Sequence, residues 1–367
     1  MYVTRTLSHY RRHPESLAIP PEGPNSGYLV IQDPDSETHS CFRLFKNRNI
    51  KHLPVPQNKE LTVCFTNYGS TNSFTSIDPV FFIPVLNQPL SSNRYYVINP
   101  QGKHKGEAFT CSREEDMAKW CLFGCVRVVK SKPFGIRDSF QVKSVALDGF
   151  PPYFLSRNRL SISTETPQHF RLDEAPGLNS KLRFRLPEFD FPLALKVCKA
   201  VCVGKWYCPI MFIKEGRLKD QVNRSLYYEM TLEQTWKQIF TCQNEKNQQN
   251  SVLIDVTVDK EVVFVGGNKV MWYDTNVVDR VMWFTSIIGL RMEIVERMKW
   301  EQARGGWRGG EERQVKIKRV EEFKGSSGWK KFGCYVLVER FVLKRMDRSL
   351  AMTYSFFHTH QLKCKWE

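Results

Sequence analysis

The chain has 367 residues, a formal net charge of +16 at pH 7 and an aromatic content of 13%. Its 25 Phe, 13 Tyr and 9 Trp residues supply enough apolar surface for a large core, which excludes a disordered, collagen-like or low-complexity protein. The length corresponds to about two domains.

No targeting signal is evident, and we expect a cytoplasmic protein, with the nucleus as the alternative. The longest apolar run, residues 80–86, is far shorter than the ~20 residues that span a membrane, so we expect no transmembrane segment. Residues 1–17 lack the apolar stretch of a secretory signal. The 11 cysteines, an odd number at irregular spacing, are then typical of reduced thiols.

The N-terminal part of the chain is predicted to be rich in β-strands. Turn-forming residues bound four apolar or alternating segments, a pattern typical of strands. These segments are residues 28–31, 61–66, 80–86 and 95–98.

Two short helices are predicted, near 112–122 and near 231–242. Each begins with a polar residue that can cap the first turn and an acidic or amide residue three positions later. Apolar residues then recur at helical spacing. They are Met117, Trp120 and Cys121 in the first segment, and Leu232, Trp236, Ile239 and Phe240 in the second.

Residues 157–192 are irregular in pattern and contain several turn-forming Pro and Gly residues. We therefore expect an N-terminal β-rich lobe over 1–156, a connection over 157–192 and a C-terminal lobe over 193–367.

The C-terminal lobe is predicted to contain an antiparallel meander over 290–362. Apolar and charged residues alternate in several of its segments, which favours strands with one buried face. Asp347-Arg348 occupies the place of a two-residue hairpin turn. The expected fold class is α+β, with predominantly antiparallel sheet, two lobes and few short helices.

A weak internal repeat is also visible. Residues 82–85, Tyr95-Tyr96 and the first helix have a similar order to residues 208–210, Tyr227-Tyr228 and the second helix. Duplication of a strand–strand–helix unit and chance similarity in an aromatic-rich chain both explain this order.

The candidate metal ligands are His358, His360 and Cys364. On one strand the two His side chains would point to the same side and could share a metal ion, with Cys364 as a third ligand if the strand continued. The simpler interpretation is that both His residues finish the apolar face of the last strand.

An anionic partner is the second chemical hypothesis. Residues 291–367 hold 18 basic and 10 acidic residues, and so carry half of the net charge. The candidate anion-binding residues are Arg304 and Arg308, which flank a glycine-rich loop at 305–310, and Lys316 and Lys318 after it. Nucleic acid and acidic lipid would both fit, and a well-solvated surface explains the same charge.

No catalytic motif is present. The chain lacks a Gly-x-Ser-x-Gly elbow, and its glycine-rich loop lacks the Lys-Ser/Thr of a phosphate-binding loop. We therefore expect no catalytic residue and no cofactor, and the function is not indicated to be enzymatic.

Eight motifs together resemble those of a known family. They are GPNSGYLVIQD at 23–33, DPVFFIPVL at 78–86, QPLSSNRYYVI at 88–98, SREED at 112–116, VGKWYCP at 203–209, EMTLEQ at 229–234, VERMKW at 295–300 and YVLVERFVL at 335–343. The chain resembles the plant-specific domain-of-unknown-function 1262 family over nearly its whole length. The resemblance implies a plant source and no particular activity. In that family an Asp-Gly hairpin is expected where Asp347-Arg348 stands here.

Three functional hypotheses follow. The first is a non-enzymatic binding or protein-interaction module with an unidentified protein partner. The alternatives are a basic protein that binds an anion, and a zinc-containing protein or hydrolase that uses His358 and His360.

Overall fold

The computed structural model describes residues 1–36, 39–40, 44–46, 54–68, 73–102, 105–109, 117–120, 123–126, 139–143, 153–154, 160–165, 183, 185–245, 250–273, 275–310, 312–326 and 328–367. Strands in mostly antiparallel sheets dominate these residues, and the helices are few and short. The predicted α+β class is thereby confirmed.

The chain forms two compact units. The N-terminal unit comprises Met1–Gly177 and Trp206–Tyr228, and the C-terminal unit comprises Leu178–Lys205 and Glu229–Glu367. The units are therefore not the contiguous lobes 1–156 and 193–367 that the sequence led us to expect. Tyr2 pairs with Tyr207 in an antiparallel ladder, and this long-range pairing places the later segment with the N-terminal unit.

In its described residues, the N-terminal unit contains strands of two to twelve residues and two short α-helices. The strands are β1 (Tyr2–Thr6), β2 (Gly27–Ile31), β3 (His39–Ser40), β4 (Phe45–Lys46), β5 (Glu60–Tyr68), β6 (Ser73–Pro84), β7 (Arg94–Ile98), β8 (Met117–Trp120), β9 (Phe123–Val126), β10 (Ser139–Lys143), β11 (Tyr153–Phe154), β12 (Leu160–Glu165), the end of β13 (Val201–Pro209) and β14 (Ile213–Glu215). The helices are α1 (Leu7–Arg12), α3 (Leu218–Arg224) and the 3-10 turns η1 (Pro14–Leu17), η2 (Pro34–Ser36), η3 (Leu90–Ser92) and η6 (Ile210–Phe212). Six strands form one sheet in the order β11-β10-β7-β6-β5-β12.

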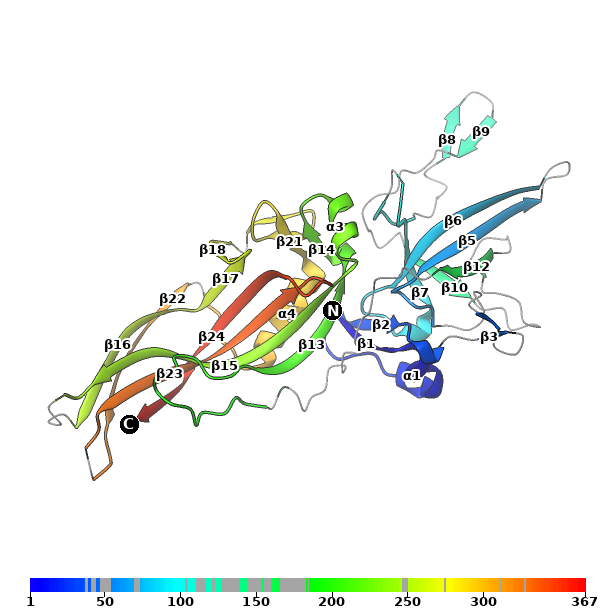
Figure 1. Ribbon diagram of the computed structural model, residues 1–367. Helices are drawn as coiled ribbons and strands as arrows, with labels where there is room; N and C mark the ends of the chain where they lie inside the picture. Colours follow the sequence, from blue (N-terminus) through cyan, green and yellow to red (C-terminus); the bar gives the residue numbers. More distant parts are fainter. Residues whose placement is uncertain are drawn as a thin grey trace. The chain divides into compact units, whose positions relative to one another are not determined.

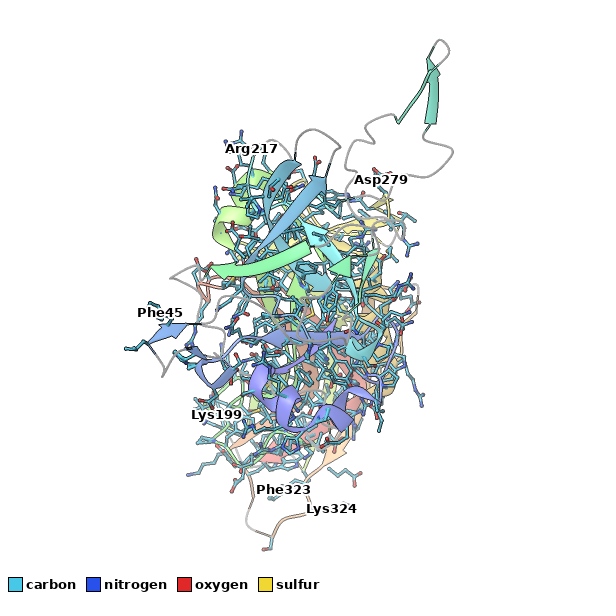
Figure 2. The ribbon with its side chains drawn as sticks, turned by 90° about the vertical axis from the view of Figure 1, so that its right-hand side faces the viewer. Phe45, Lys199, Arg217, Asp279, Phe323 and Lys324 are labelled. Atoms are coloured by element: carbon cyan, nitrogen blue, oxygen red, sulfur yellow. The ribbon has the colours of Figure 1, made fainter. Side chains whose placement is uncertain are left out.

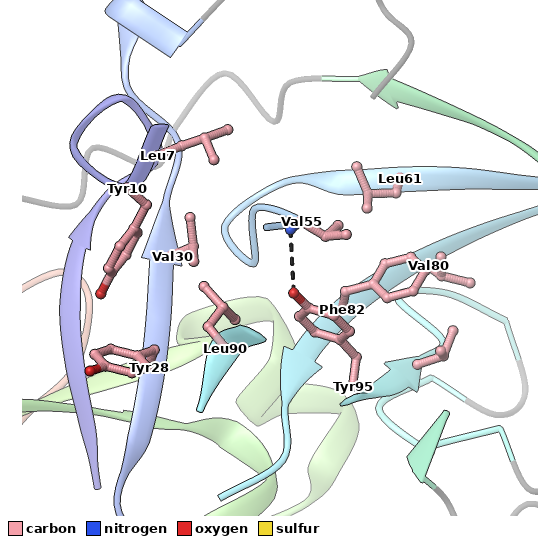
Figure 3. Packing of buried hydrophobic residues seen from close by; sticks show 11 residues of the cluster. Leu7, Tyr10, Tyr28, Val30, Val55, Leu61, Val80, Phe82, Leu90 and Tyr95 are labelled. Atoms are coloured by element: carbon pink, nitrogen blue, oxygen red, sulfur yellow. Dashed lines mark hydrogen bonds between the residues drawn. The ribbon is translucent and has the colours of Figure 1, made fainter. Parts of the chain in front are cut away.

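The core of the N-terminal unit is a cluster of buried aromatic and aliphatic side chains (Figure 3). Tyr10 packs edge-on against Tyr28, and Phe82 packs edge-on against Tyr95, with ring centroids 5.8 and 5.9 Å apart. The Tyr95 hydroxyl accepts a hydrogen bond from the Val55 amide at 3.4 Å. Complete burial raises the pKa of Tyr95, so this phenol stays neutral in the core.

The C-terminal unit is built around three long strands, β15, β23 and β24, which lie side by side (Figure 1). Its strands are β15 (Tyr227–Gln243), β16 (Ser251–Asp259), β17 (Glu261–Val265), β18 (Asn268–Val270), β19 (Val277–Val278), β20 (Val281–Trp283), β21 (Ile288–Arg291), β22 (Gln314–Glu322), β23 (Lys331–Lys344) and β24 (Leu350–Trp366), and its helix is α4 (Met292–Arg304). The order β18-β17-β24-β23-β15 runs through the main sheet, and β16 pairs with β22 in a separate ribbon.

The ribbon packs its inner face on the main sheet. Val252, Ile254 and Ile317 are buried there against residues of β23 such as Val336. The outer face carries the cross-strand partners of opposite charge, including Asp255 opposite Lys318. This alternation explains why acidic and basic residues alternate with aliphatic ones in both strands.

The predicted helix near 231–242 is wrong, because β15 spans it. Leu232, Trp236 and Phe240 are four residues apart, a spacing that fits a strand of period two as well as a helix. Residues 228, 230, 232, 234 and 236 are all buried, so the period is two. Pairing along nearly the whole of β23 outweighs the local capping signal.

The predicted helix near 112–122 is also contradicted where the structure describes it. Met117–Trp120 is strand β8, which pairs antiparallel with β9. The capping residues Ser112 and Glu115 lie outside the described residues. Within the predicted connection 157–192, Leu160–Glu165 is strand β12, paired with β5.

The predicted meander over 290–362 is wrong in two respects. Residues 292–304 form α4, whose buried residues Ile294, Val295, Met298 and Gln302 recur at helical spacing. Most residues of the segment, among them Glu, Met, Arg and Ala, are good helix formers. In addition, β22 pairs with β16 and not with β23.

Two turns in the C-terminal unit place non-glycine residues at positive φ. Asp279 and Arg280 form the two-residue turn between β19 and β20, and Asp279 marks this exposed turn in Figure 2. Between β23 and β24 the expected two-residue turn at Asp347-Arg348 is instead a longer loop, closed by a hydrogen bond from the Arg345 amide to the Ser349 carbonyl. Arg348 has φ 68° there.

Candidate functional site

A cleft of about 690 Å³ opens in the C-terminal unit beside the β17–β18 hairpin. This volume lies in the range of small-ligand sites in proteins. We call it the Trp272 cleft. It is lined by Asp259, Glu261, Val262, Lys269, Val270, Met271, Trp272, Gly310, Glu312, Arg313 and Gln314.

The cleft lies at the end of the β17–β18 ladder. Gly266 and Gly267, with φ 56° and 85°, form the tight turn, and the ladder of β17 and β18 ends at the pair Val263–Val270. The residues next to that pair outside the ladder, Val262 and Met271, both line the cleft.

Trp272 is a fixed aromatic wall of the cleft. Its ring packs edge-on against Tyr354 and tilted against Phe284, with centroids 5.4 and 5.6 Å apart. Its carbonyl accepts a hydrogen bond of 2.6 Å from Arg313, whose guanidinium lies 4.3 Å from the centroid of the Tyr273 ring. Met271 is 67% exposed, so a flexible apolar side chain lies beside a rigid ring.

The charged groups of the cleft are paired but accessible. Asp259 accepts hydrogen bonds from Lys269 at 2.7 Å and from Gln314 at 2.8 Å. These bonds, the one from Lys269 first, lower the pKa of Asp259. Glu261 accepts a hydrogen bond from the Tyr354 hydroxyl. Both carboxylates are therefore oriented acceptors, and the lowered pKa of Asp259 keeps this group ionised near neutral pH.

A second hollow, of about 330 Å³, adjoins the Trp272 cleft, because Asp259, Val262 and Lys269 line both. Its apolar wall includes Phe264, which is 37% exposed, and Phe357. We call the cleft and this hollow together the Trp272 groove.

The same unit also contains a buried network of ionisable side chains, which sequence reasoning missed. Its members are Arg183, Gln234, Arg297, Glu301, Glu339 and His358, each at most 9% exposed. Two guanidinium groups face two carboxylates, so the formal charges balance when His358 is neutral. Balanced pairing of this kind is what allows charges to be buried.

Glu339 is the centre of this network. It accepts a 2.7 Å hydrogen bond from Gln234, forms a 2.9 Å ion pair with Arg183, and lies 3.0 Å from Nε2 of His358. Arg183 also donates to the Glu301 carbonyl, and the Glu301 carboxylate pairs with Arg297 at 2.7 Å. All these contacts are internal, and we interpret the network as the rigid support of the sheet.

Gly305 makes this arrangement possible. A methyl group at this position would overlap the Arg183 guanidinium and lie 2.8 Å from Glu339 Oε2. The glycine-rich loop at 305–310 is thus partly a close-approach site at the end of α4. Its other end, Gly310, lines the Trp272 cleft.

The three candidate metal ligands have different surroundings. His358 is buried and contacts Glu339, whereas His360 is exposed, with its ring centroid 5.7 Å from that of His358. Burial first, and then the neighbouring His358 and Arg308, lowers the pKa of His360. Cys364 pairs with Cys334 beyond a bulge in β24. In the described part of the chain no group of three or more His, Cys, Asp or Glu residues could hold a metal ion.

The candidate anion-binding residues lie on two elements. Arg304 ends α4 with its guanidinium 5.2 Å from the centroid of the Trp300 ring, and Arg308 is exposed in the following loop. Lys316 and Lys318 are exposed on β22, where Lys316 pairs with Asp255 at 3.0 Å.

The Trp272 groove was also missed by sequence reasoning. One signal in the sequence could have revealed the groove. Gly266-Gly267 lies between two β-prone segments, and Met271 and Trp272 directly follow the second segment. An apolar pair that follows a tight hairpin and precedes a polar stretch is a candidate for an exposed contact surface.

Comparison with known proteins adds a family and little else. Residues 22–122 match the family model described as protein of unknown function (DUF1262). This match confirms the resemblance to the domain-of-unknown-function 1262 family over that segment, and the motifs after residue 200 lie outside it. No curated protein matches the chain.

Among solved structures, the crystal structure of Cry35Ab1 is similar, with 10% sequence identity and a TM-score of 0.47, over 85% of this chain and 90% of that chain. None of the helices in the described ranges is long and apolar enough to cross a membrane.

Proposed function

We propose that the C-terminal unit is a non-enzymatic binding module that holds an extended peptide segment of a protein partner in the Trp272 groove. The observation that carries this proposal is an accessible apolar wall, Met271 and Trp272, in a cleft of about 690 Å³. Aromatic residues, Met and Arg are enriched in the contact surfaces of protein partners.

The shape of the groove suits an extended chain. Two adjoining hollows share Asp259, Val262 and Lys269, so a bound segment could pass from one to the other. An extended peptide advances about 3.3 Å per residue and points alternate side chains to the same side. Successive alternate side chains could then contact Met271 in one hollow and Phe264 in the next.

The charges of the groove favour a peptide of mixed sequence. Lys269 and Arg313 offer donors, and Asp259, Glu261 and Glu312 offer acceptors. A groove with both signs can pair with peptide amides and with side chains of either charge, whereas a polyanion would meet the three carboxylates.

The test begins with selection of peptides from a random phage-displayed library on the purified full chain, followed by calorimetric titration of the enriched peptides. Met271→Ala and Phe264→Ala should each weaken binding by about 5- to 10-fold, because each removes an apolar contact. Both side chains are accessible, so folding should be retained.

Ile287→Ala is the matched control, since Ile287 is 59% exposed and does not line either hollow. Unchanged affinity of this variant together with weakened Met271→Ala would support the proposal. Failure to enrich any peptide, or equal affinities for all variants, would contradict it.

Anion binding is the second candidate, favoured by the exposed Lys316 and Lys318 on β22 and by Arg308. Binding to a heparin column should then fall steeply as salt rises, because phosphate or sulfate contacts release counterions. The variant Lys316→Gln/Lys318→Gln should elute at lower salt than the wild-type chain. Elution of both proteins at the same salt concentration would show that Lys316 and Lys318 do not bind the anion.

A further inference from the structure

Cys334 of β23 and Cys364 of β24 face each other across an antiparallel ladder. Residues directly opposite in such a ladder have Cα atoms about 4.5 or 5.5 Å apart, depending on the hydrogen-bonding pattern. Both spacings lie within the roughly 4.4–6.8 Å that a disulfide requires. The ladder therefore places the two Cα atoms at a spacing that a cross-strand disulfide can bridge.

The two thiols also interact directly. A hydrogen bond from Cys364 is the largest cause that lowers the pKa of Cys334, and the same contact raises the pKa of Cys364. The pair thus favours a thiolate on one sulfur and a thiol on the other. A thiolate beside a second thiol is the arrangement that thiol–disulfide exchange uses.

Only one of the two sulfur atoms belongs to a residue that solvent can reach. Cys334 is fully buried, and Cys364 is partly exposed. A small oxidant can therefore reach the Cys364 sulfur, while Cys334 can act as the resolving partner.

Other described cysteines lack this arrangement. Cys208 is fully buried, and burial raises its pKa to about 12. Cys198 contacts Thr235 and the Trp236 amide. Cys242 belongs to the same apolar cluster as Cys334, but its cross-strand partner is Phe332.

We propose that Cys334 and Cys364 are a reversible redox site, oxidised to a disulfide by low-molecular-weight disulfides such as oxidised glutathione. In the first step Cys364 passes its proton to the Cys334 thiolate, to which it is hydrogen-bonded, and the Cys364 sulfur attacks one sulfur of the oxidant; a mixed disulfide forms and one thiolate leaves. In the second step Cys334 attacks the Cys364 sulfur, its proton passes to the second thiolate, and the resulting thiol leaves. Relative to the dithiol, the protein loses two protons and two electrons, and the oxidant is reduced to two thiols.

The site lies where it could control the register of the last strand. Between Val336–Leu362 and Leu337–His358 the ladder contains a bulge, and the Cys pair holds the strands on the terminal side of it. A bond at this point would fix β24 to β23 next to the packed rings of Phe332 and Trp366, whose centroids are 4.3 Å apart.

The experiment equilibrates the full native chain with oxidised glutathione, blocks the remaining thiols by alkylation and digests with trypsin without reduction. The expected product is the peptide of residues 332–340 joined to the dipeptide Cys364-Lys365, lighter by about 2 Da than the sum of the two. The oxidised protein should melt about 5–10 °C higher than the reduced one, because the bond closes a loop in the unfolded chain.

Cys364→Ser should lose the linked peptide and the shift in Tm, while Cys242→Ser should keep both. Absence of the linked peptide from native wild-type protein would overturn the proposal, as would linkage of Cys334 to Cys242. Treatment with dithiothreitol must restore both thiols, and failure to do so would contradict reversibility.

Discussion

The ion-pair network and the Trp272 groove lie in the same unit and use the same types of side chain for different purposes. In the network, Arg183 and Glu339 are buried and form an ion pair of 2.9 Å. In the groove, Lys269 and Asp259 form an ion pair of similar length that solvent can reach. The comparison teaches that burial, and not residue type, separates structural charges from charges available to a ligand.

This difference predicts unequal costs of mutation. A buried pair broken on one side leaves an uncompensated charge in a medium of low polarity. An exposed pair broken on one side leaves a group that water can solvate.

The largest expected effect is that of Glu339→Ala. It removes the carboxylate that contacts Arg183, Gln234 and His358, and should lower the free energy of unfolding by about 3–5 kcal/mol. Urea denaturation followed by Trp fluorescence measures this. Glu312→Ala, which changes an exposed carboxylate of the groove, is the matched control and should cost less than about 0.5 kcal/mol. Similar losses of unfolding free energy in the two variants would contradict the distinction between the buried network and the exposed groove.

Gly305→Ala should cause the next largest loss in the free energy of unfolding. Its methyl group would collide with Arg183 in the network, at a cost of about 1–3 kcal/mol by the same denaturation measurement. Gly309→Ala is a suitable comparison, because the nearest atom to the added Cβ is a Trp307 ring carbon at 3.1 Å. A larger loss of stability in Gly309→Ala than in Gly305→Ala would contradict the close approach of Gly305 to Arg183.

A gain in stability is predicted for Arg348→Gly in the β23–β24 loop. Arg348 holds φ 68°, a region that costs an ordinary residue about 1–2 kcal/mol, and the greater entropy of unfolded glycine offsets part of the relief. We expect a net gain of about 0.5 kcal/mol in the free energy of unfolding. A loss of stability would show that the Arg348 side chain makes contacts that outweigh the backbone strain.

The smallest effect is expected for Asp259→Asn in the groove. The pKa of Asp259 is lowered in the folded protein, so its ion pair stabilises the fold above pH 3.8 and the contribution is lost as pH falls below that value. The variant should lose about 0.5 kcal/mol or less at pH 7 and a smaller amount at pH 2. Equal losses at both pH values would mean that Asp259 acts through packing and not through its charge.

The sequence predicted the fold class but not the type of each element. Leu232 and Trp236 fit both periods, and only the pairing of β15 with β23 decides between them. For residues 292–304 the alternation of Met292 and Ile294 favoured a strand, although the helix-forming composition of the segment favoured α4. A spacing of four residues fits both the helical period and the strand period, so the long-range pairing partners decide between them.

The residues of the buried network and of the Trp272 groove were harder to predict from the sequence than the fold class. Arg183 and Glu339 are separated by 156 positions, and no local pattern in the sequence indicates that the two side chains meet. His358 was considered as a metal ligand, whereas its Nε2 atom lies beside Glu339. Met271 and Trp272 follow a recognisable Gly-Gly turn, and their exposure in a cleft depends on where the β17–β18 ladder ends.

The most direct test of the central claim is to map a selected peptide on the full chain by backbone amide chemical shifts in NMR. If the Trp272 groove is the binding site, the largest shifts will fall at residues 259–272 and 312–314, and the amides of the buried network, such as Glu339, will change little. Largest shifts on the outward face of the ribbon, around Leu253 and Val320, would place the binding surface elsewhere and contradict the account.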